Sequence, residues 1–326
     1  MTEPTRQDLP TRQDLSARVR RQRPIVAMSA VLLPFTADGG IDWPGFEAHL
    51  VRTIEAGIVP AVNMDTGFGP YLSDAERARA LAITTAHAPD GFVAGALVDD
   101  QPGAAFDAGA YQRAMATIVE AGGTPIVFPS HGLAGVPEAE LVDAHARMAV
   151  GVDRFLGFEL GAMFHPAGRI WSLETFEAML ELPALVGAKH SSLLRGPELD
   201  RLDVRDRVRP DFLVLTGNDL AIDQVVYGSD YLLGLSTFAP EAFARRDQAW
   251  AAGDELAFWA LNDLLQYLGQ LAFRAPVPGY RHDAAMFLEL RGLIGSSRTH
   301  PDSPVRPEAD VALLADIATR LDALLP

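Results

Sequence analysis

The sequence contains no cysteine. This absence excludes disulfide bonds, cysteine-ligated zinc, iron–sulfur clusters and thiol nucleophiles, and it leaves the redox compartment undetermined. Positive charge is also scarce, because 27 Lys and Arg residues face 43 Asp and Glu residues and leave a formal net charge of −16. Such a chain repels a phosphate backbone on average, so we expect no nucleic acid partner.

Long apolar runs are missing as well. No charge-free apolar run reaches the ~18 residues that a membrane helix needs, and the segment after Met1 lacks the apolar core of a signal peptide. We therefore expect no membrane partner and a cytoplasmic location. The chain has 326 residues, of which 48% are hydrophobic and 21% charged, a composition that is typical of a globular protein with one large α/β domain and an additional region.

Lysine is the scarcest basic residue, since Lys189 is the single lysine among 27 basic residues. Arginine can replace lysine where only positive charge is needed, but it cannot supply a primary amine that loses its proton. Imine formation with a carbonyl compound requires such a neutral amine. An ordinary lysine pKa of about 10.4 must fall by about three units, or roughly 4 kcal/mol, and burial can supply this. Lys189 is therefore a candidate nucleophile, the alternatives being a surface lysine or an inert ion pair with Asp65 or Glu159.

Short apolar runs alternate with segments of helical periodicity from residue 24 onward. The runs predict strands at residues 25–33, 58–63, 92–98, 124–128, 155–160, 185–189, 212–216 and 231–235. The intervening segments predict helices at residues 44–55, 74–86, 104–121, 138–150, 173–180, from 197 onward, and 220–227. Eight strand–helix units predict an α/β fold, the (β/α)8 TIM barrel. A doubly wound sheet is disfavoured because no Gly-x-Gly-x-x-Gly loop follows the first strand.

Three regions follow from this pattern. Residues 1–23 repeat Thr-Arg-Gln-Asp-Leu and continue into a basic stretch, which predicts a flexible N-terminal tail. Residues 24–240 form the predicted barrel. In residues 241–326 the alternation stops, and apolar stripes predict a C-terminal helical appendage with helices at residues 250–273, 284–294 and 311–325. This appendage would cap the barrel or support contact between subunits.

Polar residues gather at the carboxyl ends of the predicted strands, where TIM barrels place their active sites. In strand order, these candidates are Asp65, Thr66, Gly67, Ser130, His131, Glu159, Lys189, Asn218 and Ser236. We nominate Glu159 and then His131 for proton transfer, because each is titratable. Asn218 and Ser236 are candidate binders of substrate hydroxyls or a carboxylate. His190 should point away from Lys189, because successive strand residues face opposite sides.

Several stretches in this order resemble one known family. They are Leu33-Pro34-Phe35-Thr36-Ala37-Asp38-Gly39-Gly40-Ile41-Asp42, Thr66-Gly67, Leu72-Ser73-Asp74-Ala75-Glu76-Arg77, Gly187-Ala188-Lys189-His190-Ser191-Ser192, Thr216-Gly217-Asn218-Asp219 and Gly234-Leu235-Ser236. Over about residues 24–293 the chain resembles the dihydrodipicolinate synthase and N-acetylneuraminate lyase superfamily of class I aldolases. The resemblance implies a homo-oligomer, a tetramer in the family, although the appendage could equally support a dimer. The resemblance also implies that Lys189 forms a Schiff base with pyruvate or another 2-oxo acid, without a cofactor, to make or break a carbon–carbon bond.

The sequence departs from this family at three places. The family's Gly-Thr-Thr-Gly-Glu stretch, which binds the substrate carboxylate, corresponds to Met64-Asp65-Thr66-Gly67-Phe68, so only Thr66 and Gly67 keep that implied role. Asp65 would repel a carboxylate unless protonated or paired, and would instead hold a hydroxyl, a cation or Lys189. The family's strand-five tyrosine is absent, with Glu159 as the nearest ionisable residue, and Ser130-His131 replaces a tyrosine pair. We therefore expect a reaction other than that of dihydrodipicolinate synthase.

Two alternatives remain open at this point. In a metal-dependent barrel enzyme, Asp65, Glu159, His190 and His165 would converge on a divalent ion, although no His-x-His or His-Glu-x-x-His spacing supports this. In a catalytically inactive aldolase-like protein, the barrel would bind an oxo acid without turnover, and Lys189 would not be trapped covalently.

Overall fold

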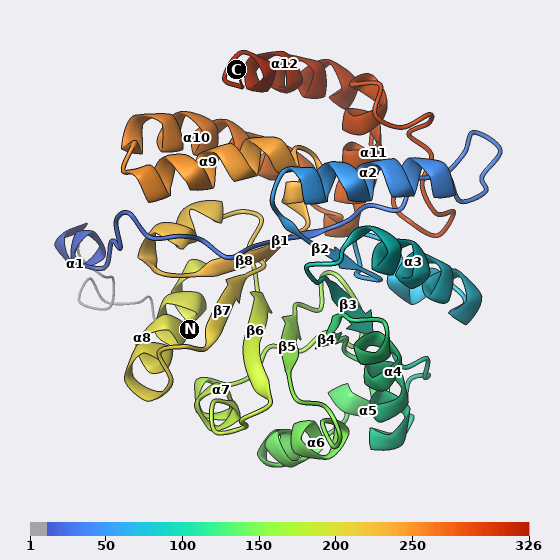
Figure 1. Ribbon diagram of the computed structural model, residues 1–326, viewed down its shortest axis with the longest axis vertical. Helices are drawn as coiled ribbons and strands as arrows, with labels where there is room; N and C mark the ends of the chain where they lie inside the picture. The colour runs from blue at the N-terminus through green and yellow to red at the C-terminus, as the bar shows by residue number, and fades with distance from the viewer. Residues whose placement is uncertain (1–11, 326) are drawn as a thin grey trace.

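The computed structural model describes residues 12–325, and its strands form a closed parallel barrel (Figure 1). The strands are β1 (Ala27–Ala30), β2 (Val59–Val62), β3 (Val93–Ala96), β4 (Thr124–Val127), β5 (Phe155–Leu160), β6 (Leu185–Ser191), β7 (Leu213–Thr216) and β8 (Asp230–Leu233). They pair in chain order, and β8 closes onto β1. The predicted TIM barrel with C-terminal helices is confirmed, and each strand overlaps the run that predicted it.

Helices surround this barrel on the outside (Figure 1). The α-helices are α1 (Arg12–Ala17), α2 (Trp43–Glu55), α3 (Asp74–His87), α4 (Ala108–Glu120), α5 (His131–Ala134), α6 (Leu141–Met148), α7 (Leu173–Met179), α8 (Arg195–Val208), α9 (Pro240–Ala252), α10 (Glu255–Ala272), α11 (Tyr280–Leu290) and α12 (Asp310–Asp322). The 3-10 helices are η1 (Gly69–Tyr71), η2 (Glu138–Glu140), η3 (Ile222–Tyr227), η4 (Leu235–Thr237) and η5 (Val277–Gly279).

Local capping chemistry explains where two of the helices begin. At α3, Ser73 accepts a hydrogen bond from the Glu76 amide while the Glu76 side chain accepts one from the Ser73 amide, a reciprocal capping box. At α7, the Ser172 hydroxyl accepts a hydrogen bond from the Thr175 amide at 3.1 Å.

Two helix predictions need correction. The sequence predicts one helix over residues 250–273, but the chain breaks there into α9 and α10. Gly253 has a φ of 80°, a left-handed conformation that ends α9, and Asp254 then accepts a hydrogen bond from Ala257 to begin α10. The predicted helix at residues 220–227 is the shorter 3-10 helix η3.

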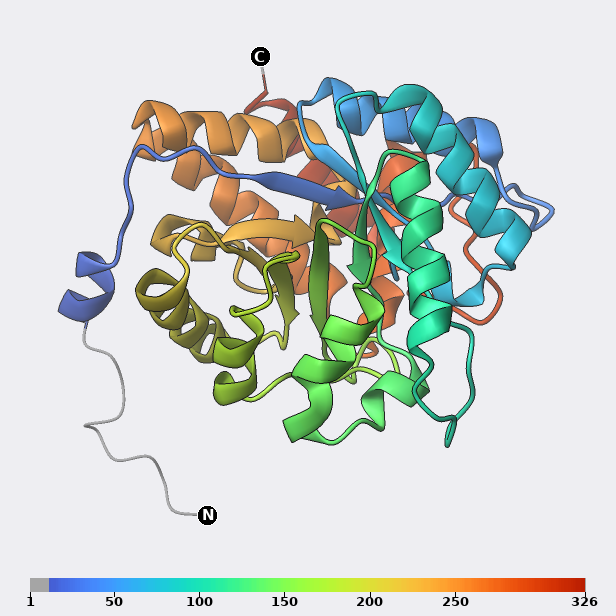
Figure 2. The same cartoon turned by 60° about the horizontal axis from the view of Figure 1, so that its bottom comes forward.

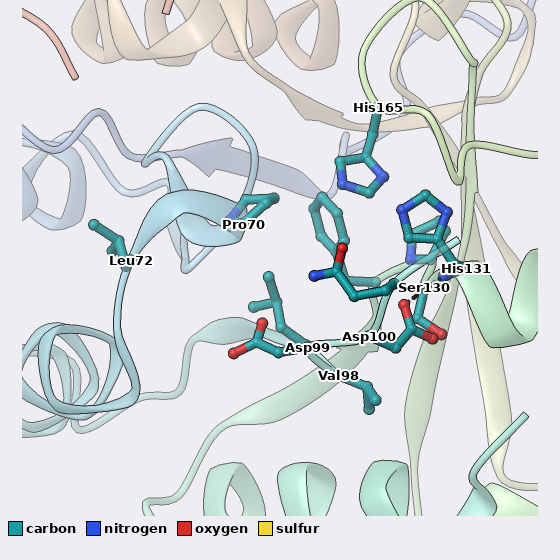
Figure 3. Close-up of a pocket in the computed structure, with 12 residues that line it drawn as sticks. Pro70, Leu72, Val98, Asp99, Asp100, Ser130, His131 and His165 are labelled. Atoms are coloured by element: carbon teal, nitrogen blue, oxygen red, sulfur yellow. Dashed lines mark hydrogen bonds between the residues drawn. The ribbon is translucent and has the colours of Figure 1, made fainter. Parts of the chain in front are cut away.

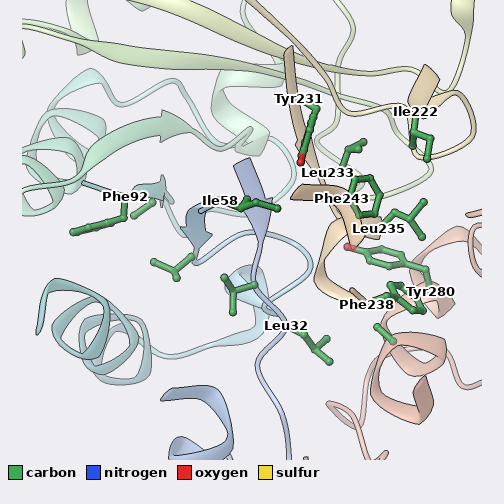
Figure 4. Packing of buried hydrophobic residues seen from close by; sticks show 14 of the residues in the cluster. Leu32, Ile58, Phe92, Ile222, Tyr231, Leu233, Leu235, Phe238, Phe243 and Tyr280 are labelled. Atoms are coloured by element: carbon green, nitrogen blue, oxygen red, sulfur yellow. The ribbon is translucent and has the colours of Figure 1, made fainter. Parts of the chain in front are cut away.

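Successive side chains of each strand point to the inside and the outside of the barrel, and they form two separate apolar cores. A small core fills the barrel and includes Leu156, Phe158 and Leu215. A larger one lies between the barrel and the helices and continues into the C-terminal region, as Figure 4 shows around Phe238 and Tyr280. Adjacent residues on a strand therefore face different surroundings, and this alternation determines which side chains can reach the barrel mouth.

The segment before β1 packs along the barrel rather than away from it (Figure 2). Arg18 pairs with Asp203 at 2.7 Å, and Arg23 pairs with Asp230 at 2.9 Å. The predicted tail spans residues 1–23, and its first 11 residues lie outside the described ones. At the other end, α9, α10 and α12 lie together beside the barrel (Figure 1). Within residues 12–325, none of the helices is both long and apolar enough to cross a bilayer.

Candidate active site

Lys189 lies inside the mouth of the barrel. Its neighbours across the sheet are Phe158 on β5 and Leu215 on β7, both part of the interior core. The residue is only 4% exposed, and its Nζ lies 4.5 Å from the centre of the Phe158 ring. Gly217 leaves space for it, because a β-carbon there would lie 2.6 Å from Lys189 Cε and would overlap the hydroxyl of Ser191. The lysine therefore occupies a fitted, largely dry position.

The two carboxylates near Lys189 act on its charge through space and not through an ion pair. Burial lowers the pKa of Lys189, while the nearby carboxylates of Asp65 and Asp219 partly oppose this effect. Within residues 12–325, Lys189 forms no ion pair with either carboxylate. Asp219 is 3% exposed and accepts a hydrogen bond from the Leu235 amide at 2.7 Å, and burial raises the pKa of Asp219 to about 7. Both groups are thus shifted toward their neutral forms.

The segment after β2 meets a tyrosine from the C-terminal region. The Tyr280 hydroxyl donates to Asp65 Oδ2 at 2.9 Å and lies 2.7 Å from the Thr66 hydroxyl. Since the phenol donates to a carboxylate, the Thr66 hydroxyl is left to donate to the phenol oxygen. Asp65 Oδ1 is buried and has no hydrogen-bond partner among the residues that the structure describes. The backbone amides of Thr66 and Gly67 donate to no acceptor within the described part of the chain. Asp65 thus accepts a hydrogen bond from a hydroxyl of the protein itself, and its role toward a substrate stays a prediction.

Glu159, nominated for proton transfer, faces the other way. Its carboxylate lies on the outer face of β5, where it pairs with Arg201 from α8 and accepts hydrogen bonds from the Trp171 amide and the His190 ring. Burial acts to raise the pKa of Glu159, but His190 and Arg201 outweigh it and lower the pKa below its usual value. The reason is strand alternation: Phe158 takes the interior position, so Glu159 cannot. His190 points away from Lys189, as alternation predicts.

His131 lies apart from Lys189, on the rim at the start of α5. It lines a cavity of about 230 Å³ together with Phe128, Ser130 and His165. Figure 3 shows the two imidazoles close together, with the Asp100 carboxylate beside His131, whose backbone amide donates to it at 2.8 Å, and Asp99 farther away. The two rings are 6.1 Å apart, and Phe128 packs against Phe158, which in turn contacts Lys189. This apolar contact chain links the cavity to the lysine.

Asn218 and Ser236, both nominated as binders, are fully buried. The Ser236 hydroxyl already bonds the Ser29 hydroxyl at 2.8 Å and the Leu233 carbonyl at 2.9 Å. Asn218 Oδ1 accepts from the Leu220 amide at 3.1 Å, whereas its Nδ2 has no partner. The Ser236 hydroxyl is therefore already hydrogen-bonded within the barrel, whereas Asn218 Nδ2 is a donor without an acceptor among the described residues.

The residues of the metal-dependent alternative do not converge. Asp65 lies in the barrel mouth, whereas Glu159 and His190 lie on the outer face of β5 and β6. Among residues 12–325, no group of three or more histidine, aspartate or glutamate side chains could hold a metal ion. The arrangement around Lys189 instead brings an amine, two carboxylates and a phenol into one region of the barrel mouth.

Comparison with known proteins rests on structure. No protein-family model matches the sequence, and no curated sequence is similar to it. A prophage protein of the dihydrodipicolinic acid synthase family from E. coli K12, solved with pyruvate, superposes with a TM-score of 0.78 at 19% identity, covering 91% of this chain and 98% of the other. Dihydrodipicolinate synthase from Thermotoga maritima gives 0.76 at 18% identity, covering 92% and 99%. This chain has the dihydrodipicolinate synthase fold.

A third structure with the same fold is a catalytic lysine mutant of Ruminococcus gnavus sialic acid aldolase. It superposes with a TM-score of 0.74 at 15% identity, covering 93% of this chain and 97% of the other. The dihydrodipicolinate synthase fold therefore accounts for nearly the whole length of these structures and for more than nine tenths of this chain.

Within this dihydrodipicolinate synthase fold, Tyr280 is the site residue that sequence reasoning missed. It begins α11, in a region that the strand pattern assigns to an appendage, and it is 1% exposed. Its partner Asp65 lies 215 residues earlier in the chain. The one available signal was the aspartate itself, because a buried carboxylate requires a hydrogen-bond donor that the barrel segment does not supply.

Proposed function

We propose that this protein is a class I aldolase or lyase in which Lys189 forms an imine with a 2-oxo acid of the pyruvate type. The observation that carries the proposal is a buried lysine in the barrel mouth that forms no ion pair and whose pKa is lowered by burial. A lysine of this kind is activated for attack on a carbonyl carbon. The fold shared with aldolases supports the proposal but does not carry it.

The proposed first step joins Lys189 to the substrate. The neutral amine adds its lone pair to the ketone carbon and forms a carbinolamine. The former carbonyl oxygen takes one proton from the nitrogen and one from solvent water and leaves as water, while the nitrogen lone pair forms the C=N bond of an iminium. This C=N bond accepts electrons when a neighbouring carbon–carbon bond forms or breaks. The iminium is positively charged, so Asp65 and Asp219 stabilise it more than they stabilise the neutral amine.

The substrate carboxylate has suitable donors near Asp65. The free backbone amides of Thr66 and Gly67 are the groups we assign to it, because an anion is stabilised by unpaired N–H donors. The free Nδ2 of Asn218 is a further donor on the same rim. The rim cavity with His131 and His165 would hold the second reactant. A reaction other than that of dihydrodipicolinate synthase is proposed because β5 presents Phe158, which has no hydroxyl, to the lysine.

Reductive trapping tests the proposal. Borohydride added with pyruvate, and separately with longer 2-oxo acids, should reduce the imine and add the corresponding mass to the peptide that contains Lys189. Lys189→Arg should abolish the added mass while leaving the circular dichroism spectrum unchanged. An unmodified wild-type lysine across the whole panel would contradict the proposal and favour a binding protein without imine chemistry.

We also propose that the protein forms a homo-oligomer, as the resemblance implies. Trp259 and Tyr267 on α10 are partly exposed apolar side chains available for such contact. Light scattering coupled to size-exclusion chromatography would give the mass in solution, and a monomer at micromolar concentration would contradict this part. The cytoplasmic location stays a prediction of the sequence.

A further inference from the structure

The interior of the barrel lacks the group expected to move protons next to Lys189. On β5 the side chain closest to Lys189 in register is Phe158, a ring without a hydroxyl. Glu159 is turned outward and saturated by Arg201, His190 and the Trp171 amide. An imine alone does not complete the chemistry, because forming the enamine requires a base at the adjacent carbon. Another residue of the mouth must supply it.

Asp65 has the free lone pairs that such a base needs. Its side chain is 8% exposed, and Oδ1 has no hydrogen-bond partner among residues 12–325. Leaving a buried acceptor unpaired costs about 1–3 kcal/mol, so the site retains it at the expense of stability. Asp65 acts electrostatically on Lys189 but does not pair with it. The two groups therefore influence each other without a direct contact between them.

Tyr280 fixes the other oxygen of this carboxylate. Its hydroxyl donates to Oδ2 at 2.9 Å, and its ring stacks on Phe273 with centres 4.2 Å apart. Figure 4 shows Tyr280 reaching from α11 toward the strands. Gly234 leaves space for the phenol, because a β-carbon there would lie 3.2 Å from the hydroxyl. The next residue, Arg281, donates to the Asp65 carbonyl at 3.0 Å, so α11 holds both the side chain and the backbone of Asp65.

We propose that Asp65 is the general base of the imine reaction and that Tyr280 is its positioning residue. This inference rests on the proposed function. Oδ1 removes a proton from the carbon next to the iminium carbon. The C–H electron pair becomes the enamine C=C bond, and the C=N π pair moves to nitrogen. Asp65 then holds the proton as a carboxylic acid and returns it in the reverse step.

The phenol itself is assigned no proton transfer. Burial, and then the negative charge of Asp65, raise the pKa of Tyr280 well above its usual value, so the hydroxyl keeps its proton and remains a donor. Asp219 is the competing base, with one oxygen occupied by the Leu235 amide as Asp65 has one occupied by Tyr280, so the test below includes a variant of each carboxylate. The chain thus replaces the tyrosine missing from β5 by a carboxylate from the segment after β2, held by a tyrosine from the C-terminal helices.

Two measurements on the same samples separate the base from the nucleophile. Pyruvate is incubated with the protein in D2O, and incorporation of deuterium into its methyl group is followed by NMR. Borohydride trapping at Lys189 is measured in parallel. Asp65→Asn should lower the exchange rate by about 100-fold or more while trapping persists. Tyr280→Phe should lower exchange about tenfold with trapping unchanged, a split that a purely structural role would not produce.

A matched control for Asp65 comes from the outer groove between α10 and α12. Asp263→Asn alters an exposed carboxylate there and should leave both measurements unchanged. Trapping also shows that each variant retains a folded site. Asp219→Asn should slow exchange less than Asp65→Asn does.

The outcomes are distinct. Three results would overturn the assignment of Asp65 as the base and leave the proposed function intact. They are exchange at the wild-type rate in Asp65→Asn, exchange that is lost in Asp219→Asn but kept in Asp65→Asn, and a wild-type protein that traps pyruvate without exchanging its protons. Absence of trapping in the wild-type protein would refute the proposed function and this inference together.

Discussion

Two buried charged clusters lie on opposite sides of the barrel wall, one outside β5 and β6 and one around Lys189 in the barrel mouth. On the outer face of β5 and β6, Glu159 pairs with Arg201 and accepts a hydrogen bond from His190, and both carboxylate oxygens are occupied. In the barrel mouth, and counting the described residues alone, Lys189 has no ion pair and the carboxylate of Asp65, from the segment after β2, keeps one oxygen without a partner. The two clusters have similar burial and similar residue types, but only the inner one is incomplete.

This difference separates a structural role from a chemical one. A buried ion pair that is fully hydrogen-bonded resists change, because removing either member leaves an uncompensated charge. An incomplete cluster is costly to the fold and is retained where a ligand completes it. Burial and charge alone would rank Glu159 and Lys189 equally, so the number of satisfied partners is the more informative property. The following substitutions test this comparison.

The largest effect is expected from Glu159→Gln. The change leaves Arg201, which is 3% exposed, with an unbalanced buried charge. We expect the free energy of unfolding to fall by about 3–5 kcal/mol, measured by urea denaturation. Glu47→Gln, at an exposed pair with His87, serves as the control and should change it by less than about 0.5 kcal/mol. A loss below about 1 kcal/mol for Glu159→Gln would remove the distinction between the clusters.

The next effect concerns pH and Asp219. The raised pKa of about 7 means that the folded state holds a proton that the unfolded chain, with a reference value of 3.8, has already lost. The protonated Asp219 contributes fully to the stability of the folded state below pH 3.8, and this contribution is lost as the pH rises through 7. Between pH 5 and pH 8, Asp219→Asn should therefore become more stable relative to the wild-type protein by about 2–3 kcal/mol. The same difference in unfolding free energy between Asp219→Asn and the wild-type protein at both pH values would contradict this.

A smaller loss is expected from Gly217→Ala. The new methyl group overlaps the Ser191 hydroxyl and crowds Lys189 Cε, so the lysine must move from its fitted position. Overpacking of this kind costs about 1–3 kcal/mol, and the rate of borohydride trapping should fall with it. Gly196→Ala, where no atom lies within 4 Å, is the control and should be neutral or slightly stabilising. Trapping at the wild-type rate in Gly217→Ala would show that the fit of the lysine is unimportant.

The smallest change in stability is expected from Lys189→Met. Methionine fills a similar volume without an amine, and the wild-type amine makes no ion pair that the substitution could break. The free energy of unfolding should stay within about 1 kcal/mol of the wild-type value or rise. A loss as large as that of Glu159→Gln would mean that the inner cluster also serves the fold.

Much of the architecture could be predicted from the sequence. Each strand overlaps a predicted run because fully buried parallel strands are short, apolar and bounded by turn residues. The position of Lys189 was predictable from composition, since a single lysine among arginines coincides with a strand end. The break in the helix at residues 250–273 was also visible in principle, because Gly253 followed by Asp254 is a helix-ending residue next to a helix-starting one.

The site was less predictable, for two physical reasons. The inward or outward direction of Glu159 depends on the register that pairs Phe158 with Lys189, and register arises from packing between strands rather than from either strand alone. Tyr280 reaches Asp65 only because the C-terminal helices fold back over the strand ends. No local pattern around either residue encodes that contact.

Titration of Lys189 tests the central claim most directly. Because the chain contains one lysine, protein grown with carbon-13-labelled lysine gives a single lysine side-chain signal, whose NMR shift can be followed against pH. A lysine that is buried and free of ion pairs should titrate clearly below the ordinary value of about 10.4. A midpoint at or above that value, as for an exposed or ion-paired lysine, would contradict the assignment of Lys189 as the nucleophile.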